Sequence, residues 1–123
     1  MFTEKFDRYA CTGDTITTEC GIITVTAFIE DDIDSNVKDS DCYSDKDIKA
    51  WRNDEWRFCG IVLTVEIAGI ELDDHAASLW GIELNFPKSD NSYLAEVAND
   101  LLPEALEVAR NHADDIIKAV NNG

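Results

Sequence analysis

Basic residues are scarce in this chain, with ten Lys and Arg against 26 Asp and Glu and a net charge of −16 over 123 residues. Proteins that bind nucleic acid or anionic membranes directly present basic surfaces, so the charge argues against both as direct ligands. Yet 45% of the residues are hydrophobic, which is more than a disordered acidic tail contains. The sequence therefore predicts a single folded domain, residues 1–123, whose partner is a basic protein surface.

Long apolar runs are missing as well. No segment approaches the roughly 20 apolar residues that a membrane-spanning helix needs. Residues 1–8 lack the basic stretch followed by an apolar stretch that marks a secretory signal. The expected location is the cytoplasm, with no membrane partner.

Histidine and paired cysteines are also rare. The chain has two histidines and four cysteines, and no two cysteines form a C-x-x-C pair. This spacing does not suit a zinc site, and a cytoplasmic protein keeps its thiols reduced. We expect free thiols, with Cys20 and Cys59 as small core residues, and no cofactor.

Catalytic motifs are absent: there is no G-x-S-x-G, no P-loop and no dinucleotide fingerprint. His75 follows Asp73 and Asp74 in a predicted turn, where a bond to a neighbouring carboxylate accounts for it. His112 falls on the apolar side of the last predicted helix, as a core histidine does. We therefore expect that the protein is not an enzyme.

One acidic loop resembles the start of a calcium site, because Asp32, Asp34 and Asn36 alternate like its first ligands. The sixth position is Val37 where such loops need Gly, and the twelfth is Tyr43 where they need Glu. A solvated acidic loop is the better interpretation, and no metal is expected.

The order of elements predicts an α+β fold. Thr15–Thr18 and Ile22–Ile29 are rich in Thr, Ile and Val and predict two strands or one bulged strand. A loop over 30–44 leads to a short helix over 45–53, whose start S-D-K-D at Ser44 resembles a capping box, and 56–68 is the strongest strand. After a turn at Gly69, residues 70–72 can continue a hairpin, and 78–86 predict a further strand.

The last third is helical, with apolar residues spaced three and four apart from Leu94 onward. Pro103 suits the first turn of a new helix, so either two helices or one kinked helix is expected. A second apolar stripe follows Pro103: Ala105, Leu106, Ala109, His112, Ile116 and Val120. The fold class is thus an antiparallel sheet of about four strands, with a short helix between strands and the C-terminal helices packed on one face.

The tryptophans can either anchor the core or contribute to a partner interface. Trp51 and Trp56 are five residues apart across the turn from the short helix to the next strand, where core anchoring outweighs a role in a partner interface. Trp80, between Leu79 and Gly81, is expected in the core.

The negative charge has definite locations. Residues 30–47 carry eight acids and two bases, 66–109 carry ten acids and only Lys88, and the last fourteen residues are balanced. Four acids recur at intervals of four, four and three and would form one ridge if Pro103 does not break the helix: Glu96, Asp100, Glu104 and Glu107. Such spacing is of the order needed to imitate a row of phosphates. The candidate partner-binding residues are this ridge together with Asp31, Asp32, Asp34, Glu71, Asp73 and Asp74.

Two segments carry a resemblance: S-L-W-G-I-E-L at 78–84 and D-N-S-Y-L-A-E-V-A-N-D-L-L-P-E-A-L at 90–106. Over roughly residues 43–110 the chain resembles small proteins of phages and other mobile elements. In size and charge it is similar in kind to the anti-restriction and anti-CRISPR proteins that mimic nucleic acid. These groups share a strategy and not a motif, so no residue roles carry over.

The resemblance implies an inhibitor in the cytoplasm of a host bacterial cell. It would block the basic DNA- or RNA-binding groove of a CRISPR effector or restriction enzyme. The alternative is an immunity protein or antitoxin that neutralises a cationic toxin. A small enzyme or metal-binding domain is the third reading, and a homodimer is plausible because exposed strand edges pair readily.

Overall fold

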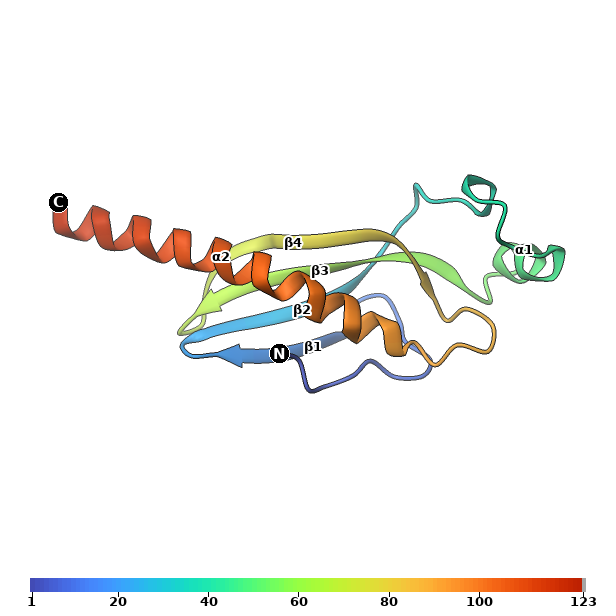
Figure 1. Ribbon diagram of the computed structural model, residues 1–123, viewed down its shortest axis with the longest axis horizontal. Helices are drawn as coiled ribbons and strands as arrows, with labels where there is room; N and C mark the ends of the chain where they lie inside the picture. Colours follow the sequence, from blue (N-terminus) through green and yellow to red (C-terminus); the bar gives the residue numbers. More distant parts are fainter. Residues whose placement is uncertain (123) are drawn as a thin grey trace.

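A computed structural model describes residues 1–122 (Figure 1). Four strands, one short 3₁₀ helix and two α-helices follow one another along the chain. Their order is β1 (Thr15–Cys20), β2 (Ile23–Asp31), η1 (Val37–Asp39), α1 (Asp45–Arg52), β3 (Arg57–Ile67), β4 (Ile70–Leu84) and α2 (Ser92–Asn122).

The four strands form one antiparallel sheet in the order β1-β2-β3-β4, so each strand pairs with its neighbours in sequence. Two-residue turns join β1 to β2 and β3 to β4, whereas a long connection that contains η1 and α1 joins β2 to β3. At the β3–β4 turn Ile67 pairs with Ile70, and Ala68 and Gly69 between them have φ of 52° and 79°. Two consecutive residues with positive φ make the type of turn whose twist matches that of an antiparallel hairpin. The α+β prediction, with its four-stranded antiparallel sheet, is confirmed.

Strand β4 departs from the expected pattern. The sequence suggested a turn around His75 and separate strands at 70–72 and 78–86, but Ile70–Leu84 is one strand. Its pairing with β3 shifts register at several points, where β4 has extra residues. These bulges disturb the alternation of apolar and polar residues, and so they hid the continuity of the strand.

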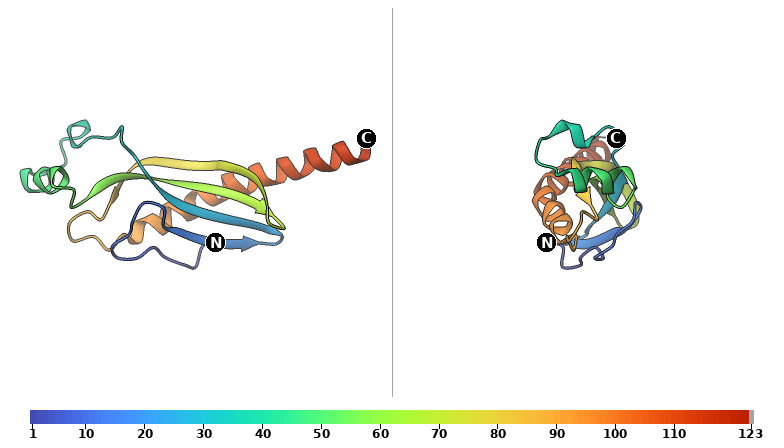
Figure 2. Two further views of the ribbon diagram at one scale, coloured as in Figure 1. Left: turned by 180° about the vertical axis from the view of Figure 1, so that it is seen from behind. Right: turned by 90° about the vertical axis from the view of Figure 1, so that its right-hand side faces the viewer.

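Helix α2 covers one face of the sheet (Figures 1 and 2). Alternate residues of β2 and β3 point to this face and are buried, as are residues that recur along α2. The main contributors are Val25, Ala27, Ile29, Cys59, Ile61, Leu63, Val65, Leu94, Ala98, Leu102, Ala105 and Ala109. Phe2, Phe6 and Ala10 of the N-terminal segment belong to the same core.

Pro103 lies inside α2, and the helix continues through it without interruption. Of the two expectations, two helices or one kinked helix, the structure has one helix from Ser92 to Asn122. The second apolar stripe is correct as far as Ala109, which is buried. Ile116 and Val120 are exposed, because the end of α2 extends beyond the sheet (Figure 1).

A buried asparagine joins the N-terminal segment to the start of α2. The side-chain amide of Asn91 donates to the carbonyls of Asp7 and Arg8 and to Oδ1 of Asn85, at 3.3, 3.0 and 2.7 Å. Its Oδ1 accepts from the Asn85 N–H at 2.9 Å. Asn91 is 1% exposed. These bonds satisfy its polar atoms, as burial requires.

A second, smaller core lies around α1 at one end of the sheet. Ser44 caps α1 in a capping box with Asp47, as its sequence predicted. Trp56 is 1% exposed and its indole N–H donates to the Asp47 carbonyl at 2.9 Å. Val37 and Phe58 complete the buried cluster, with Trp51 partly buried against it. The core-anchoring interpretation of Trp56 is confirmed.

Within residues 1–122, neither helix combines the length and apolar character needed to cross a membrane.

Candidate protein-binding surface

The predicted acidic ridge exists on α2. Glu96, Asp100, Glu104 and Glu107 are all exposed and all belong to one helix. At about 100° per residue they lie opposite the stripe of Leu102, Ala105 and Ala109 that packs on the sheet. Eleven residues separate the first from the last, which corresponds to about 16 Å of helix. Between Ser92 and Ala109 the helix contains no Lys or Arg, so no basic side chain of α2 interrupts the ridge.

The uncovered face of the sheet carries two acids that sequence reasoning missed, Glu19 and Glu66, beside the predicted Glu71. Glu19 pairs with Thr24, Thr24 with Glu66, and Glu66 with Glu71, so four strands contribute to one row. Glu66 and Glu71 stand directly opposite each other, an arrangement that costs stability because like charges repel. Only the pairing register of the strands brings these acids into one row. The sequence showed only that polar and apolar residues alternate along each strand, which does not reveal which residues of different strands are neighbours.

Two further acids of β4, Asp73 and Asp74, each lie close to a histidine side chain. Asp73 Oδ2 lies 3.4 Å from Nε2 of His112, and Asp74 Oδ1 lies 3.3 Å from Nδ1 of His75. The expected bond between His75 and a neighbouring carboxylate is thus present, although in a strand and not in a turn. His112 is on the apolar side of α2 as predicted, but its side chain is 44% exposed, so it is not the core histidine that the sequence predicted.

Asp32 has a structural role. Its carboxylate accepts hydrogen bonds from the backbone N–H groups of Asp34 and Ser35, each at 3.1 Å, and from the Ser35 hydroxyl and Gly81 N–H, each at 2.8 Å. Burial acts to raise the pKa of Asp32, but these hydrogen bonds outweigh it, and the pKa lies below its usual value. The bonds fasten the loop after β2 to β4.

The calcium-like pattern of Asp32, Asp34 and Asn36 makes hydrogen bonds within its own loop. The Asn36 side chain accepts from the Lys38 N–H and caps η1. Within residues 1–122, no three His, Cys, Asp or Glu side chains gather closely enough to hold a metal ion.

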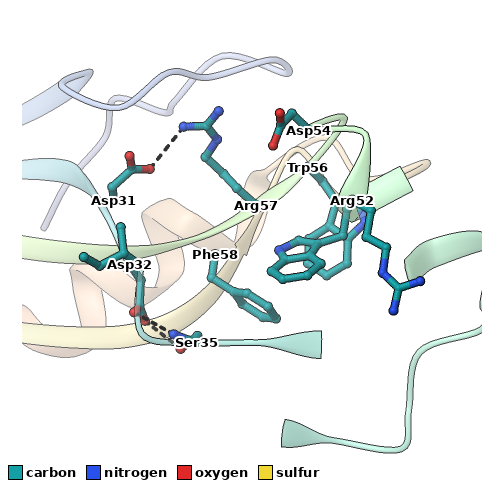
Figure 3. A pocket seen from close by; sticks show the side chains of 10 residues that line it. Asp31, Asp32, Ser35, Arg52, Asp54, Trp56, Arg57 and Phe58 are labelled. Carbon is teal, nitrogen blue, oxygen red and sulfur yellow. Dashed lines mark hydrogen bonds and ion pairs between the residues drawn. The ribbon is translucent and has the colours of Figure 1, made fainter. Parts of the chain in front are cut away.

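Two adjoining hollows lie beside this loop. They share Asp31, Asp32, Ile33 and Ser35, and each has a volume of about 490 Å³. Figure 3 shows the first, which reaches α1 and the start of β3. Asp31 Oδ1 pairs there with the Arg57 guanidinium at 3.2 Å, both groups being about half exposed. Exposed pairs of this kind add little stability. Arginines in the walls make this hollow less acidic than the ridge.

Trp80 lines the second hollow and is 44% exposed, so its expected place in the core is wrong. Its ring lies against the backbone of Gly60, where a Cβ atom would be 2.2 Å from Cε3. The ring is thus held on the face of the sheet that α2 does not cover. Sequence alone placed it between apolar neighbours, but the bulge beside Gly60 turns it outward.

The ten predicted residues do not form one patch. Asp31 pairs with Cys59 and Glu71 pairs with Glu66, and these two β3 residues are seven positions apart, or about 23 Å. Asp31, Asp32 and Asp34 therefore lie at the α1 end of the sheet, and Glu71, Asp73 and Asp74 lie at the other end. The α2 ridge runs along the outside between them (Figure 1).

All four cysteines are free thiols. Cys59 is buried in the main core, as predicted, and burial followed by the charges of Asp32 and Asp31 raises its pKa to about 12. Cys20 packs partly buried against the same core. At neutral pH the Cys59 thiol is protonated and behaves as an apolar core group.

The comparisons with known proteins assign neither a family nor a function to this chain. No protein-family model, curated protein or solved structure matches this chain. Its function must be argued from the surface itself.

Proposed function

We propose that the protein is a non-enzymatic inhibitor that presents α2 as a substitute for a nucleic-acid strand and occupies the basic groove of a DNA- or RNA-binding protein. The observation that supports this proposal is the ridge of Glu96, Asp100, Glu104 and Glu107, exposed along one unbroken helix. Single strands of duplex DNA carry one charge per about 3.4 Å of axis, hence about five over 16 Å. The ridge supplies four carboxylates over this length.

The expected target is a CRISPR effector or a restriction enzyme in a host bacterial cell, because such an effector must hold nucleic acid in a positively charged channel. Arg and Lys side chains that contact phosphates would contact the ridge instead. The net charge of −16 would also accelerate the encounter, since opposite charges steer association.

A competition assay tests this proposal. Labelled duplex DNA is bound to a panel of purified restriction enzymes and guide-loaded CRISPR effectors, and displacement is followed by fluorescence anisotropy. We expect displacement from at least one target, weaker at 0.5 M than at 0.05 M NaCl. A panel that retains its DNA at both salt concentrations would contradict the proposal.

Matched variants separate the ridge from the total charge. The ridge variant combines Glu96→Gln, Asp100→Asn, Glu104→Gln and Glu107→Gln. The control combines Glu4→Gln, Asp7→Asn, Asp41→Asn and Glu55→Gln, which are exposed positions outside α2. Both variants lose four negative charges. The ridge variant should lose inhibition at least tenfold more than the control, and equal losses would show that only net charge matters.

The alternative, an immunity protein or antitoxin for a cationic toxin, draws on the same charge and on the aromatic walls of the hollows at the α1 end. In that case Trp51→Ala and Trp80→Ala would weaken binding more than the ridge variant does, because buried tryptophans dominate protein–protein interfaces.

A further inference from the structure

The apolar side of α2 continues past the point where the sheet stops covering it. Leu102, Ala105 and Ala109 are buried against the sheet, and the same side of the helix then presents Ile116 and Val120, which are 54% and 74% exposed. Figure 1 shows this last part of α2 extending beyond the β3–β4 turn. The stripe that packs the core therefore has a second part without a partner within the chain.

The sheet contributes apolar residues at the same end. Ile22 in the β1–β2 turn is 76% exposed and Ile70 after the β3–β4 turn is 68% exposed. Both turns lie at the end over which α2 extends (Figures 1 and 2). Among residues 1–122, five of the ten exposed large hydrophobic side chains belong to this far end of the molecule. The far end consists of Ile22, Ile70, Ile116, Ile117 and Val120.

Charge favours a second copy of this chain as the occupant. The helix from residue 110 onward has two acids and two bases, so it is the balanced part of a strongly acidic protein. Asp114 and Lys118 are each two residues from Ile116, about 200° around the helix, and so point away from the apolar side. A basic partner is drawn to the acidic surfaces instead of to this one. This part of α2 therefore adds no net charge to a contact between two copies.

The neighbouring acids add complementarity. Glu66 and Glu71 flank the β3–β4 turn, and within the described chain neither forms an ion pair. When the end of α2 lies across the far end of another copy, the Arg110 guanidinium comes within reach of these carboxylates. In a two-fold arrangement each contact occurs twice.

We propose that two copies associate through their far ends, each placing Ile116 and Val120 of α2 against Ile22 and Ile70 of the other. Ten side chains, each more than half exposed in the single chain, then become buried together. Their combined area is of the order of the roughly 1,000 Å² that a specific interface requires. The α2 ridges stay exposed in this dimer, because they lie on the opposite side of the helix.

Sedimentation velocity over a range of protein concentrations at 0.05 and 0.5 M NaCl tests the proposal. We expect a species of twice the 13.7 kDa chain mass, with tighter association at the higher salt because screening weakens repulsion between acidic copies. A chain that stays monomeric at several hundred micromolar at both salt concentrations would overturn it. Association that weakens with salt would also overturn it.

Point variants test the location. Ile116→Lys and Ile70→Lys should each weaken association by at least about thirtyfold, as a central interface residue does. Ile33→Lys is the matched control, because Ile33 is 89% exposed at the α1 end. A far-end variant with wild-type association, or a control that dissociates, would overturn the location. Far-UV circular dichroism verifies folding, and Val120→Lys replaces any variant that does not fold.

Discussion

Replacing Gly60 by Ala tests how the uncovered sheet face is packed. A Cβ at this position would lie 2.2 Å from Cε3 of Trp80 and 2.6 Å from both Cδ2 and Cζ3. These atoms belong to the middle of the indole and not to a flexible tip, so the ring must move by about an ångström to reach ordinary contact. Overpacking of this kind costs about 1–3 kcal/mol.

An opposing contribution comes from the unfolded chain. The φ of Gly60 is outside the left-handed region, so the backbone itself accepts Ala. Ala restricts the unfolded state more than Gly does and so stabilises by about 0.4–1 kcal/mol. We expect Gly60→Ala to lower the free energy of unfolding by about 1–2 kcal/mol in the wild-type protein.

The sign should reverse when the ring is absent. In a Trp80→Ala background only the unfolded-state contribution remains, so Gly60→Ala should stabilise by a few tenths to about 1 kcal/mol. Urea unfolding followed by far-UV circular dichroism, on the four proteins of this double-mutant cycle, measures both values. Equal effects of Gly60→Ala in the two backgrounds would refute the proposed contact between Gly60 and Trp80.

Three further predictions concern the site and its helix. Pro103→Ala should raise the free energy of unfolding by about 1–3 kcal/mol in the same urea assay, because proline removes one helix hydrogen bond at an exposed position. An unchanged or lower value would mean that packing on the sheet requires a bend in α2 at Pro103. The lowered pKa of Asp32 means that its ionised form stabilises the fold above the unfolded pKa of about 3.8 and that this contribution is lost as pH falls below it. The difference in urea midpoint between wild type and Asp32→Asn should therefore shrink from pH 5 to pH 2, and a constant difference would exclude the hydrogen-bonded carboxylate as its cause. Burial raises the pKa of Tyr93 to about 12, with its hydroxyl donating to the Glu83 carbonyl. Stability due to the neutral phenol is thus complete below pH 10 and lost towards pH 12, and wild type should lose more stability than Tyr93→Phe over that interval.

The sequence by itself determined the elements whose signals are local. The Thr-, Ile- and Val-rich runs at 15–18 and 22–29, the Ser44 cap of α1 and the 3.6-residue period after Leu94 each predicted the observed element within a few residues. The ridge on α2 was also predictable, because side chains three and four apart share one side of any helix.

Proline was the exception among these local signals. Pro103 admitted either a break or a continuous helix, and packing of Leu102 and Ala105 on the sheet favours continuity. The free energy gained by burying the residues before and after Pro103 outweighs the loss of one helix hydrogen bond. This gain depends on contacts with the sheet, so it could not be judged from the sequence.

Features that depend on strand register could not be predicted. The row of Glu19, Glu66 and Glu71 exists because three strand pairings align it, and the exposure of Trp80 follows from a bulge opposite Gly60. A shift of one residue would move each side chain to the other face. Likewise, the helical spacing of apolar residues up to Ile116 and Val120 predicts an apolar side of α2. It does not predict where the sheet that covers this side ends. Periodicity along the chain thus gave the elements and the negative ridge, whereas the length of the sheet and the pairing of its strands decided which apolar and acidic groups remain on the surface.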